Sequence, residues 1–174
     1  QLYGVCIMKE KLSEIINNLH SNKNLVEFDE AATKQTIILR ILSSLGWDQY
    51  NRNEVYPEYT VGTKKVDYAL RINQSIVFIE VKKVSEDLEK ENHQEQLLNY
   101  SFQQGVKLAI LTNGITWWFY LPLHEGNWNK RKFYSIDINE QNSEEIATKF
   151  IDFLSYENVK NGIAFTNAEK VKKA

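Results

Sequence analysis

The sequence has very little cysteine and no long apolar run, and both absences narrow its class. Cys6 is the single cysteine, so neither an internal disulfide nor a thiolate zinc cluster can form. No stretch approaches the roughly 18 apolar residues of a membrane span. The segment from Gln1 to Ile7 lacks the positive charge that opens a signal peptide. These absences favour a protein of the reducing cytoplasm without a membrane segment.

An excess of positive charge is also missing. The formal net charge is −2 at pH 7, which argues against a protein that coats nucleic acid by bulk charge. It does not argue against an enzyme that touches phosphate through local basic groups. The 3 histidines are too scattered along the chain to predict a histidine metal site. The phosphate-binding pattern G-x-x-x-x-G-K-[ST] of ATPases does not occur.

The composition that is present suits one folded domain. The chain has 174 residues, 43% of them hydrophobic and 25% charged, which is enough for a single core. Apolar spacing predicts helices over residues 9–20, 28–45, 86–102 and 143–154. It predicts strands over residues 53–61, 64–72, 75–84, 106–112, 115–121 and 130–138. Strands that form hairpins and also alternate with helices indicate an α/β fold, with a mixed sheet flanked by helices.

The pattern divides the chain into three segments. Residues 1–27 hold an N-terminal helix and a lead-in, and residues 28–156 hold the expected domain. Residues 157–174 are weakly patterned, and this tail is compatible with a helix that packs elsewhere or with a segment that leads into a further region. Asn113-Gly114 is the strongest hairpin signal. Ser143 is predicted to cap the helix that follows it.

Two carboxylates are predicted to face each other across a hairpin. If Asn73-Gln74 is a two-residue turn, its flanking residues pair, and the same register sets Asp67 opposite Glu80. Carboxylates so placed would repel each other, and a divalent cation held between them would remove the repulsion. Strand alternation puts Lys82 on the face of Glu80, where its ammonium group could act on a bound water. This is the chemistry of metal-dependent phosphodiester hydrolysis.

The expected surroundings of the two acids differ. Glu80 lies in a run that is apolar on both faces, which is typical of a central strand, where an unpaired carboxylate is costly. The alternative to a metal is a salt bridge from Glu80 to Lys82 or Lys65. Asp67 shares its predicted face with polar residues and would, taken alone, be a solvent-side residue. Val66 and its alternate neighbours on the opposite face are expected in the core.

Three further residues are candidates that also have an ordinary structural explanation. The spacing of Glu30 fits an acid that faces the site and equally a first-turn acid favoured by the helix dipole. Its neighbour Asp29 is expected to cap the helix. Gln96 and Tyr100 are i, i+4 neighbours and could lie over the acids. A helix with a polar and aromatic surface explains the same two residues without a function.

In this order the motifs resemble the PD-(D/E)xK nuclease superfamily. More closely, they resemble the N-terminal nuclease domain of type I restriction enzyme R subunits and their stand-alone relatives, over about residues 28–154. The motifs that carry the resemblance are Glu30-Ala31-Ala32-Thr33, Val66-Asp67-Tyr68-Ala69-Leu70, Ile79-Glu80-Val81-Lys82-Lys83, Gln96-x-x-x-Tyr100 and Leu108-Ala109-Ile110-Leu111-Thr112-Asn113-Gly114. Val66 stands where the superfamily name has proline, which is not a ligand. The ATP-driven motor of the R subunit is absent.

The resemblance implies a Mg²⁺-dependent DNA endonuclease in restriction or phage defence, with Mn²⁺ able to substitute. By this resemblance Asp67, Glu80 and Glu30 would hold the metal. Lys82 would orient or deprotonate the attacking water, and in-line attack would release the 3′ oxygen. The residues expected to position DNA are Gln96, Tyr100, Lys65 and Lys83.

The expected partners are DNA, other restriction-modification subunits and, if both strands are cut, a second copy in a homodimer. An alternative is a non-catalytic nuclease-fold module for DNA binding or protein docking, in which the acids are idle. The modest net charge and the missing motor favour this module, whereas the complete acidic set with its lysine disfavours it. A third reading is an RNA-directed nuclease, since phosphate chemistry does not distinguish the sugars.

Overall fold

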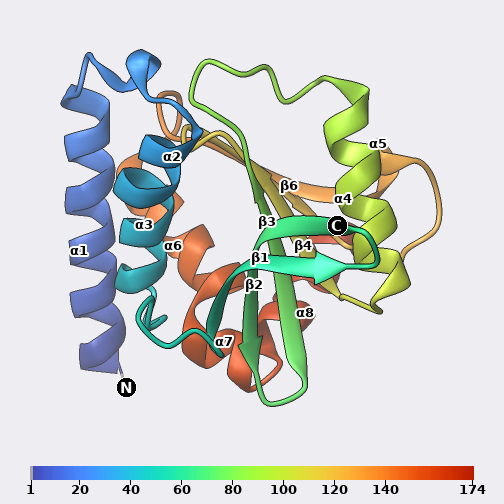
Figure 1. Cartoon of the computed structure of the whole chain (residues 1–174). Helices are drawn as coiled ribbons and strands as arrows, with labels where there is room; N and C mark the ends of the chain where they lie inside the picture. Colours follow the sequence, from blue (N-terminus) through green and yellow to red (C-terminus); the bar gives the residue numbers. More distant parts are fainter. Residues whose placement is uncertain (1) are drawn as a thin grey trace.

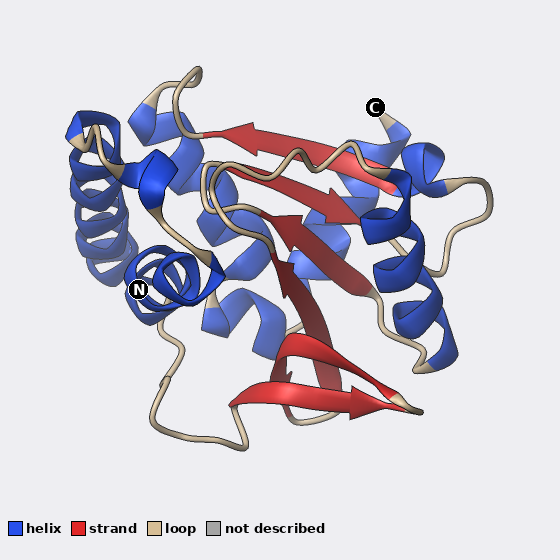
Figure 2. Ribbon diagram, turned by 45° about the horizontal axis from the view of Figure 1, so that its top comes forward, coloured by secondary structure: helices blue, strands red, loops and turns tan. Residues whose placement is uncertain are grey.

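The computed structural model describes residues 2–174, apart from the side chain of Glu91. A six-stranded sheet has the order β1-β2-β3-β4-β5-β6, and helices lie on both of its faces (Figure 1 and Figure 2). The predicted mixed sheet flanked by helices is therefore confirmed. Within the described residues, no helix is long and apolar enough to cross a membrane.

Each strand pairs with its neighbour in the sequence. The strands are β1 (Val55–Val61), β2 (Lys64–Ile72), β3 (Ser75–Val81), β4 (Leu108–Thr112), β5 (Thr116–Tyr120) and β6 (Lys132–Asp137). The pair β3–β4 is parallel and the other pairs are antiparallel. A parallel pair needs a long crossover connection. Here that connection contains α4 (Glu91–Gln103), which packs on β3 and β4.

The remaining helices are α1 (Leu2–Ser21), α2 (Glu30–Ala32), α3 (Leu39–Ser44), α5 (Trp128–Arg131), α6 (Ser143–Leu154), α7 (Tyr156–Lys160) and α8 (Ile163–Lys173), with a 3-10 turn at Leu25–Glu27.

The helix predicted over residues 28–45 is not uniform. A π-helical segment, Thr33–Ile38, joins α2 to α3. The backbone N–H of Leu39 donates to the carbonyl of Lys34, five residues back. Such widened turns are frequent at functional sites.

The two faces of the sheet carry cores of different size. Leu70 and Ile79 point into the larger core, which α1, α3, α6 and α8 cover. Phe78 and Leu111 point into the smaller core, where Leu97 of α4 meets them. Figure 1 shows α1, α3 and α6 on one side of the sheet and α4 and α5 on the other. Because both faces are covered, the central strand β3 is apolar on both, as its sequence predicts.

The turn between β4 and β5 lies one residue later than predicted. The backbone N–H of Asn113 donates to the carbonyl of Thr116, which leaves Gly114 and Ile115 as the loop. Gly114 has a φ of +91°, and a Cβ there would lie 2.9 Å from Cδ1 of Ile37 and 3.2 Å from Cγ2 of Thr33. A glycine is therefore required, and the π-helical segment packs directly on this turn.

The C-terminal part also differs in detail from the expectation. The N-cap of α6 is Asn142, whose side chain accepts hydrogen bonds from two backbone N–H groups, so the prediction that Ser143 is the cap is wrong by one residue. Asparagine satisfies the free N–H groups of a first turn as well as serine does. The weakly patterned residues 157–174 are largely helical, and Ala164 and Ala168 of α8 are buried in the larger core.

Candidate active site

The candidate site lies where β2 and β3 stop pairing through their backbones. The residues that flank the predicted turn pair as expected, and the ladder continues to Tyr68 and Ile79. Beyond them, Oδ2 of Asp67 accepts a hydrogen bond from the N–H of Val81 at 2.7 Å. In return, Oε1 of Glu80 accepts one from the N–H of Asp67 at 3.1 Å. The two acids are therefore opposite each other, as the register predicts, and their carboxylates replace the next rungs of the ladder.

The two carboxyl groups hold one proton between them at neutral pH. Burial alone would raise the pKa of Asp67, but hydrogen bonds outweigh burial and the pKa lies below its ordinary value. These bonds come from Glu80, Lys34 and the N–H of Val81. Burial raises the pKa of Glu80 to about 9; the hydrogen bond and charge of Asp67 add to the rise, and the charge of Lys82 opposes it. Glu80 is thus protonated and Asp67 ionised.

A lysine that the sequence motifs did not single out lies among the acids. Nζ of Lys34 is 2.6 Å from Oδ1 of Asp67, 3.4 Å from Oε1 of Glu30 and 3.6 Å from Oε1 of Glu58. Burial opposes its charge, but Asp67 and Glu30 hold the pKa of Lys34 above its ordinary value. An ammonium ion is therefore seated among three carboxylates. The only sequence signal for it was the i, i+4 spacing from Glu30.

Glu58 is the second residue that the motifs missed. It follows Pro57 on the edge strand β1 with a φ of 52°, in the left-handed region that is uncommon outside glycine. The register pairs Pro57 with Tyr68 and Tyr59 with Val66, which sets Glu58 opposite Asp67. The backbone irregularity of β1 therefore coincides with the site, and nothing in a single sequence announces a left-handed glutamate.

The alternation of β2 is broken at Asp67. Val66 and Ala69 are buried in the smaller core under α4, whereas Tyr68 and Leu70 are in the larger core. The expectation that Val66 shares a core face with Tyr68 is therefore wrong, and so is a solvent-side face for Asp67. The break in alternation lies opposite the left-handed residue of β1, and the carboxylate of Asp67 is covered by the ammonium of Lys34 at 2.6 Å.

Lys82 lies on the face of Glu80, as predicted. Its Nζ is 4.0 Å from Oε2 of Glu80, and its backbone N–H donates to the carbonyl of Thr112 at 2.8 Å, so the residue is anchored beside β4. Of the two lysines that the sequence offered as partners of Glu80, Lys82 is therefore the one beside it, at a long separation from a protonated carboxyl group. Lys65 is exposed and makes no salt bridge with Glu80 within the described residues.

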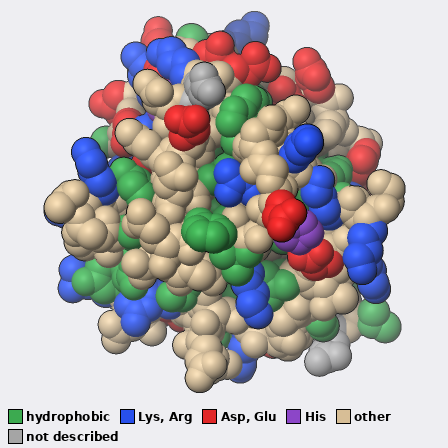
Figure 3. Space-filling model, turned by 90° about the vertical axis from the view of Figure 1, so that its right-hand side faces the viewer, with side chains coloured by type: hydrophobic (Ala, Val, Ile, Leu, Met, Phe, Trp, Pro, Cys, Tyr) green, Lys and Arg blue, Asp and Glu red, His purple; other side chains and the backbone are tan. Residues whose placement is uncertain are grey.

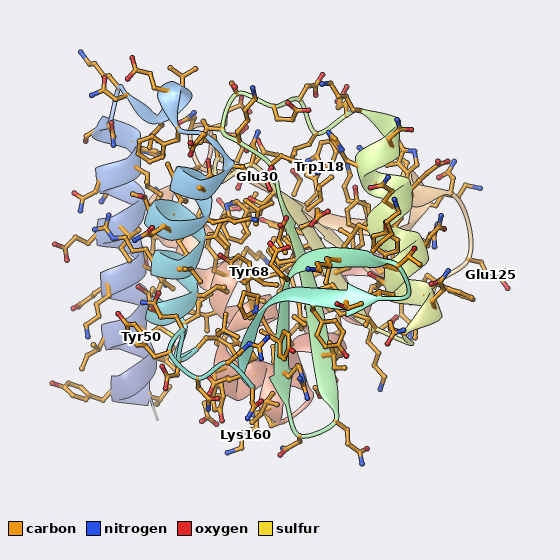
Figure 4. All side chains as sticks on the ribbon, viewed as in Figure 1. Glu30, Tyr50, Tyr68, Trp118, Glu125 and Lys160 are labelled. Carbon is orange, nitrogen blue, oxygen red and sulfur yellow. The ribbon has the colours of Figure 1, made fainter. Side chains whose placement is uncertain are left out.

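Glu30 reaches the acid pair indirectly. Asp29 caps the helix as expected, so Glu30 is free to extend from the first turn, with 48% of its side chain exposed. It contacts Lys34, which in turn contacts Asp67. In Figure 4, Glu30 is labelled above Tyr68, and Tyr50 is labelled below it. Both sequence interpretations of Glu30 thus describe part of its environment.

Of the residues expected to position DNA, Tyr100 is the one that is partly buried. It packs on the smaller core, and burial, with a further contribution from nearby Glu80, raises its pKa. Gln96, Lys65 and Lys83 are exposed. Figure 3, which looks at the molecule from the α4 side, shows acidic and basic side chains interspersed on this face.

An arginine–tyrosine cluster, formed by Arg52, Arg71, Tyr56 and Tyr59, lies on the same side of the sheet. The guanidinium of Arg52 is 4.4 Å from the ring centre of Tyr56. That of Arg71 is 5.6 Å from Tyr56 and 5.8 Å from Tyr59. Tyr59 contacts Phe78 in the smaller core. Stacking on rings leaves the edges of a guanidinium available to hydrogen-bond phosphate.

The oxygen donors of Asp67 and Glu80 are of the type that suits a hard divalent cation. Within the described residues, no three acidic, histidine or cysteine side chains converge closely enough to hold a metal ion. Asp67 and Glu80 converge, and Lys34 separates Asp67 from Glu30. Carboxylate oxygens are the ligands that Mg²⁺ prefers. A buried carboxyl pair that must share a proton is a pair that a cation would allow to ionise.

The comparison with protein families agrees with the motifs. Residues 58–128 match the family model described as the N terminus of the type I restriction enzyme R protein. The matched segment contains Asp67, Glu80 and Lys82 and excludes Glu30 and Lys34. The resemblance drawn from the motifs is therefore confirmed for this segment.

A search of solved structures finds a similar chain, a fragment described as an HsdR subunit of a type I restriction enzyme from Vibrio vulnificus YJ016. The sequence identity is 16% and the TM-score 0.45, over 76% of this chain and 27% of that chain. This protein thus spans about a quarter of the length of that structure. The curated proteins contain no match.

Proposed function

Since residues 58–128 match the N-terminal family of type I restriction enzyme R proteins, we propose that this chain is a Mg²⁺-dependent DNA endonuclease domain. Its role would be in restriction or phage defence, with DNA as substrate. Other restriction-modification subunits would be its partners, and a homodimer would form if both strands are cut. Mn²⁺ would substitute for Mg²⁺.

The observation that carries this proposal is the meeting of Asp67, Glu80 and Lys82 at the opened end of the β2–β3 hairpin. The carboxylates of Asp67 and Glu80 each accept a hydrogen bond from a backbone N–H of the opposite strand, and the ammonium of Lys82 lies 4.0 Å from Oε2 of Glu80. Folding alone does not require these residues, because burying a polar or charged side chain costs free energy and burying an apolar side chain does not.

In the proposed reaction, the oxygen of a water molecule attacks the phosphorus in line and the bond from phosphorus to the 3′ oxygen breaks. The attacking water gives a proton to solvent, and the departing 3′ oxygen takes one from solvent to become a hydroxyl. Bound Mg²⁺ would supply Lewis-acid stabilisation of the phosphate charge. Asp67 and Glu80 would hold the ion, with Glu30 as a further acid. The ammonium of Lys82 would orient the water and stabilise the developing negative charge. Tyr100 would contact the DNA beside the acids.

Exposed groups on the same side of the molecule suit the DNA backbone. Lys65, Lys83 and Gln96 would donate hydrogen bonds to phosphate oxygens, which position a duplex without reading its sequence. Arg52 and Arg71 of the arginine–tyrosine cluster extend the set. A few such contacts suffice for a protein whose net charge is −2, because only the surface near the site needs to be basic.

One observation favours the alternative, a non-catalytic module for DNA binding or docking. Lys34 already neutralises Asp67 at 2.6 Å, so the acids can persist without any metal. The two functions differ in their response to Mg²⁺, since only a site that binds the ion gains stability from it by mass action.

The test is plasmid cleavage with Mg²⁺, Mn²⁺ or EDTA. We expect the wild type to nick DNA only with metal, and Lys82→Ala to lose about 100- to 1,000-fold in rate, the range for one group that stabilises developing charge. Lys11→Ala, an exposed lysine of α1, is the matched control and should cut at the wild-type rate. Thermal unfolding of each variant checks its fold.

Wild-type cleavage by Lys82→Ala would reject the assignment of the site. If the wild type neither cleaves DNA nor gains stability from metal, the non-catalytic binding module is the function supported. A structured RNA tested in parallel separates a DNA enzyme from an RNA enzyme.

A further inference from the structure

Lys34 occupies the position of a counter-ion in the site. Its ammonium lies 2.6 Å from Asp67, closer than to its other partners, and only 20% of the side chain is exposed. The short separation marks a charge-assisted hydrogen bond. A divalent ion that binds to Asp67 must weaken or break this bond, because the carboxylate cannot coordinate the metal ion and also accept a strong hydrogen bond from the ammonium of Lys34.

We propose that Lys34 is a positioning residue that holds Asp67 while the site is free of metal, yields it when a divalent cation binds, and is then retained by Glu58. This inference rests on the proposed metal-dependent function and adds to it a resident cation that the entering ion displaces. The device would set a threshold: the site would fill only at a metal concentration high enough to outcompete the lysine.

The geometry makes the exchange short. Nζ of Lys34 is already 3.6 Å from Oε1 of Glu58, so the ammonium can change its main partner by side-chain rotation alone. Glu58 is more exposed than Asp67, with 58% of its side chain accessible against 12%. Glu58 therefore lies at the exposed edge of the site, where its ion pair with Lys34 stays partly hydrated and loses little solvation free energy.

The backbone of Glu58 supports a functional role that is independent of these distances. A left-handed φ of 52° at a glutamate is an unfavourable conformation that persists only where the surroundings determine it. Here it sets the side chain of Glu58 opposite Asp67 in the strand register. The π-helical segment contributes the other half, because Lys34 lies within that segment and is presented to the sheet by it.

The experiment measures Mn²⁺ and Mg²⁺ affinity by calorimetry without DNA, on the wild type, Lys34→Met, Glu58→Gln and the double variant. Releasing the competition of one charge-assisted bond should tighten metal binding about 10- to 100-fold in Lys34→Met. Glu58→Gln alone should weaken binding, because Glu30 is assigned to the metal and a displaced lysine then loses its other acceptor. In the Lys34→Met background, Glu58→Gln should have no effect on affinity, a coupling that a double-mutant cycle isolates.

Lys64→Met is the matched control, since it removes an exposed positive charge from β2 without breaking an observed ion pair; its metal affinity should stay near that of the wild type. Should Lys34→Met fail to fold in EDTA, Lys34→Gln replaces it in the same cycle. An unchanged affinity in the Lys34 variant would overturn the inference, as would an equal effect of Glu58→Gln in both backgrounds.

The same measurements separate the inference from the proposed function. Metal binding by the wild type with no change in Lys34→Met leaves the nuclease proposal standing and rejects the role of Lys34. Binding that is detected only in Lys34→Met supports the resident cation and favours the non-catalytic module in the wild type. An absence of binding in every variant rejects both.

Discussion

The two ends of the β2–β3 hairpin are made from the same pair of strands and differ in almost every physical respect. At the turn end, backbone pairs run without interruption from Ile72 and Ser75 onward, and the inward side chains are apolar. At the open end, the carboxylates of Asp67 and Glu80 replace backbone groups as hydrogen-bond acceptors. The difference shows that a sheet can be interrupted without loss of order when side chains take over its hydrogen bonds.

The two ends also differ in their contribution to the free energy of folding. The turn end gains free energy from apolar burial and ladder hydrogen bonds. The open end buries two carboxyl groups that must share one proton, which is unfavourable unless the site has a use for them. The contrast predicts that substitutions at the open end change the response to metal and pH, whereas substitutions at the turn end change stability alone.

The largest effect is expected from Asp67→Asn, which removes a charge from the open end. At a free Mg²⁺ concentration of about one hundred times Kd, the wild type should gain about 2.7 kcal/mol in unfolding free energy. The variant should gain almost nothing, because a neutral amide is a poor ligand for a hard cation. Chemical denaturation with Mg²⁺ and with EDTA gives both values. An equal gain in the two proteins would place the metal elsewhere.

The next effect is a pH dependence that belongs to Glu80. Its pKa is raised from 4.5 in the unfolded chain to about 9 in the folded protein. The contribution of Glu80 to stability is therefore fully present below the pKa of the unfolded chain and is lost as the pH rises through the pKa of the folded protein. In EDTA, the unfolding free energy should therefore fall with rising pH between about 5 and 8, by at most about 1.4 kcal/mol per pH unit from this group.

Glu80→Gln is the control for this pH dependence, since an amide keeps the donor and cannot ionise. Its stability profile should be flatter than that of the wild type over the same interval. Parallel profiles would show that Glu80 is ionised throughout, contrary to the shared proton.

The smallest effect is expected at the turn end, from Asn73→Gly. Asn73 has a φ of 54°, which glycine adopts without strain, while its added freedom in the unfolded chain acts in the opposite direction. The unfolding free energy should change by less than about 1 kcal/mol, and the stabilisation by Mg²⁺ should be unchanged. A large change in the Mg²⁺ effect would show that the two ends of the hairpin are energetically coupled.

Sequence reasoning succeeded where the pattern was local and regular. The two-residue turn at Asn73-Gln74 sets the register, and the register alone brings Asp67 opposite Glu80. Alternation then places Lys82 on the same face. These inferences needed only period-two geometry and turn chemistry.

It failed where the backbone departs from regular geometry. Lys34 reaches the acids from a π-helical segment, and Glu58 does so through a left-handed φ. The switch of faces between Val66 and Tyr68 has the same origin. Such departures are stabilised by tertiary packing, including the contact of Gly114 with Ile37, and therefore leave no periodic signal in a single sequence.

The main-chain hydrogen bonds of Asp67 and Glu80 have a consequence for how this molecule can vary. Each carboxylate is tied to a backbone N–H of the opposite strand, and every residue type except proline supplies that group. Under the proposed function, Lys65, Gln96 and Lys83 would be exchangeable to suit a new target while the two acids keep their places. Chemistry and recognition would then be separable traits, one inherited with the sheet and the other free to diversify on its surface.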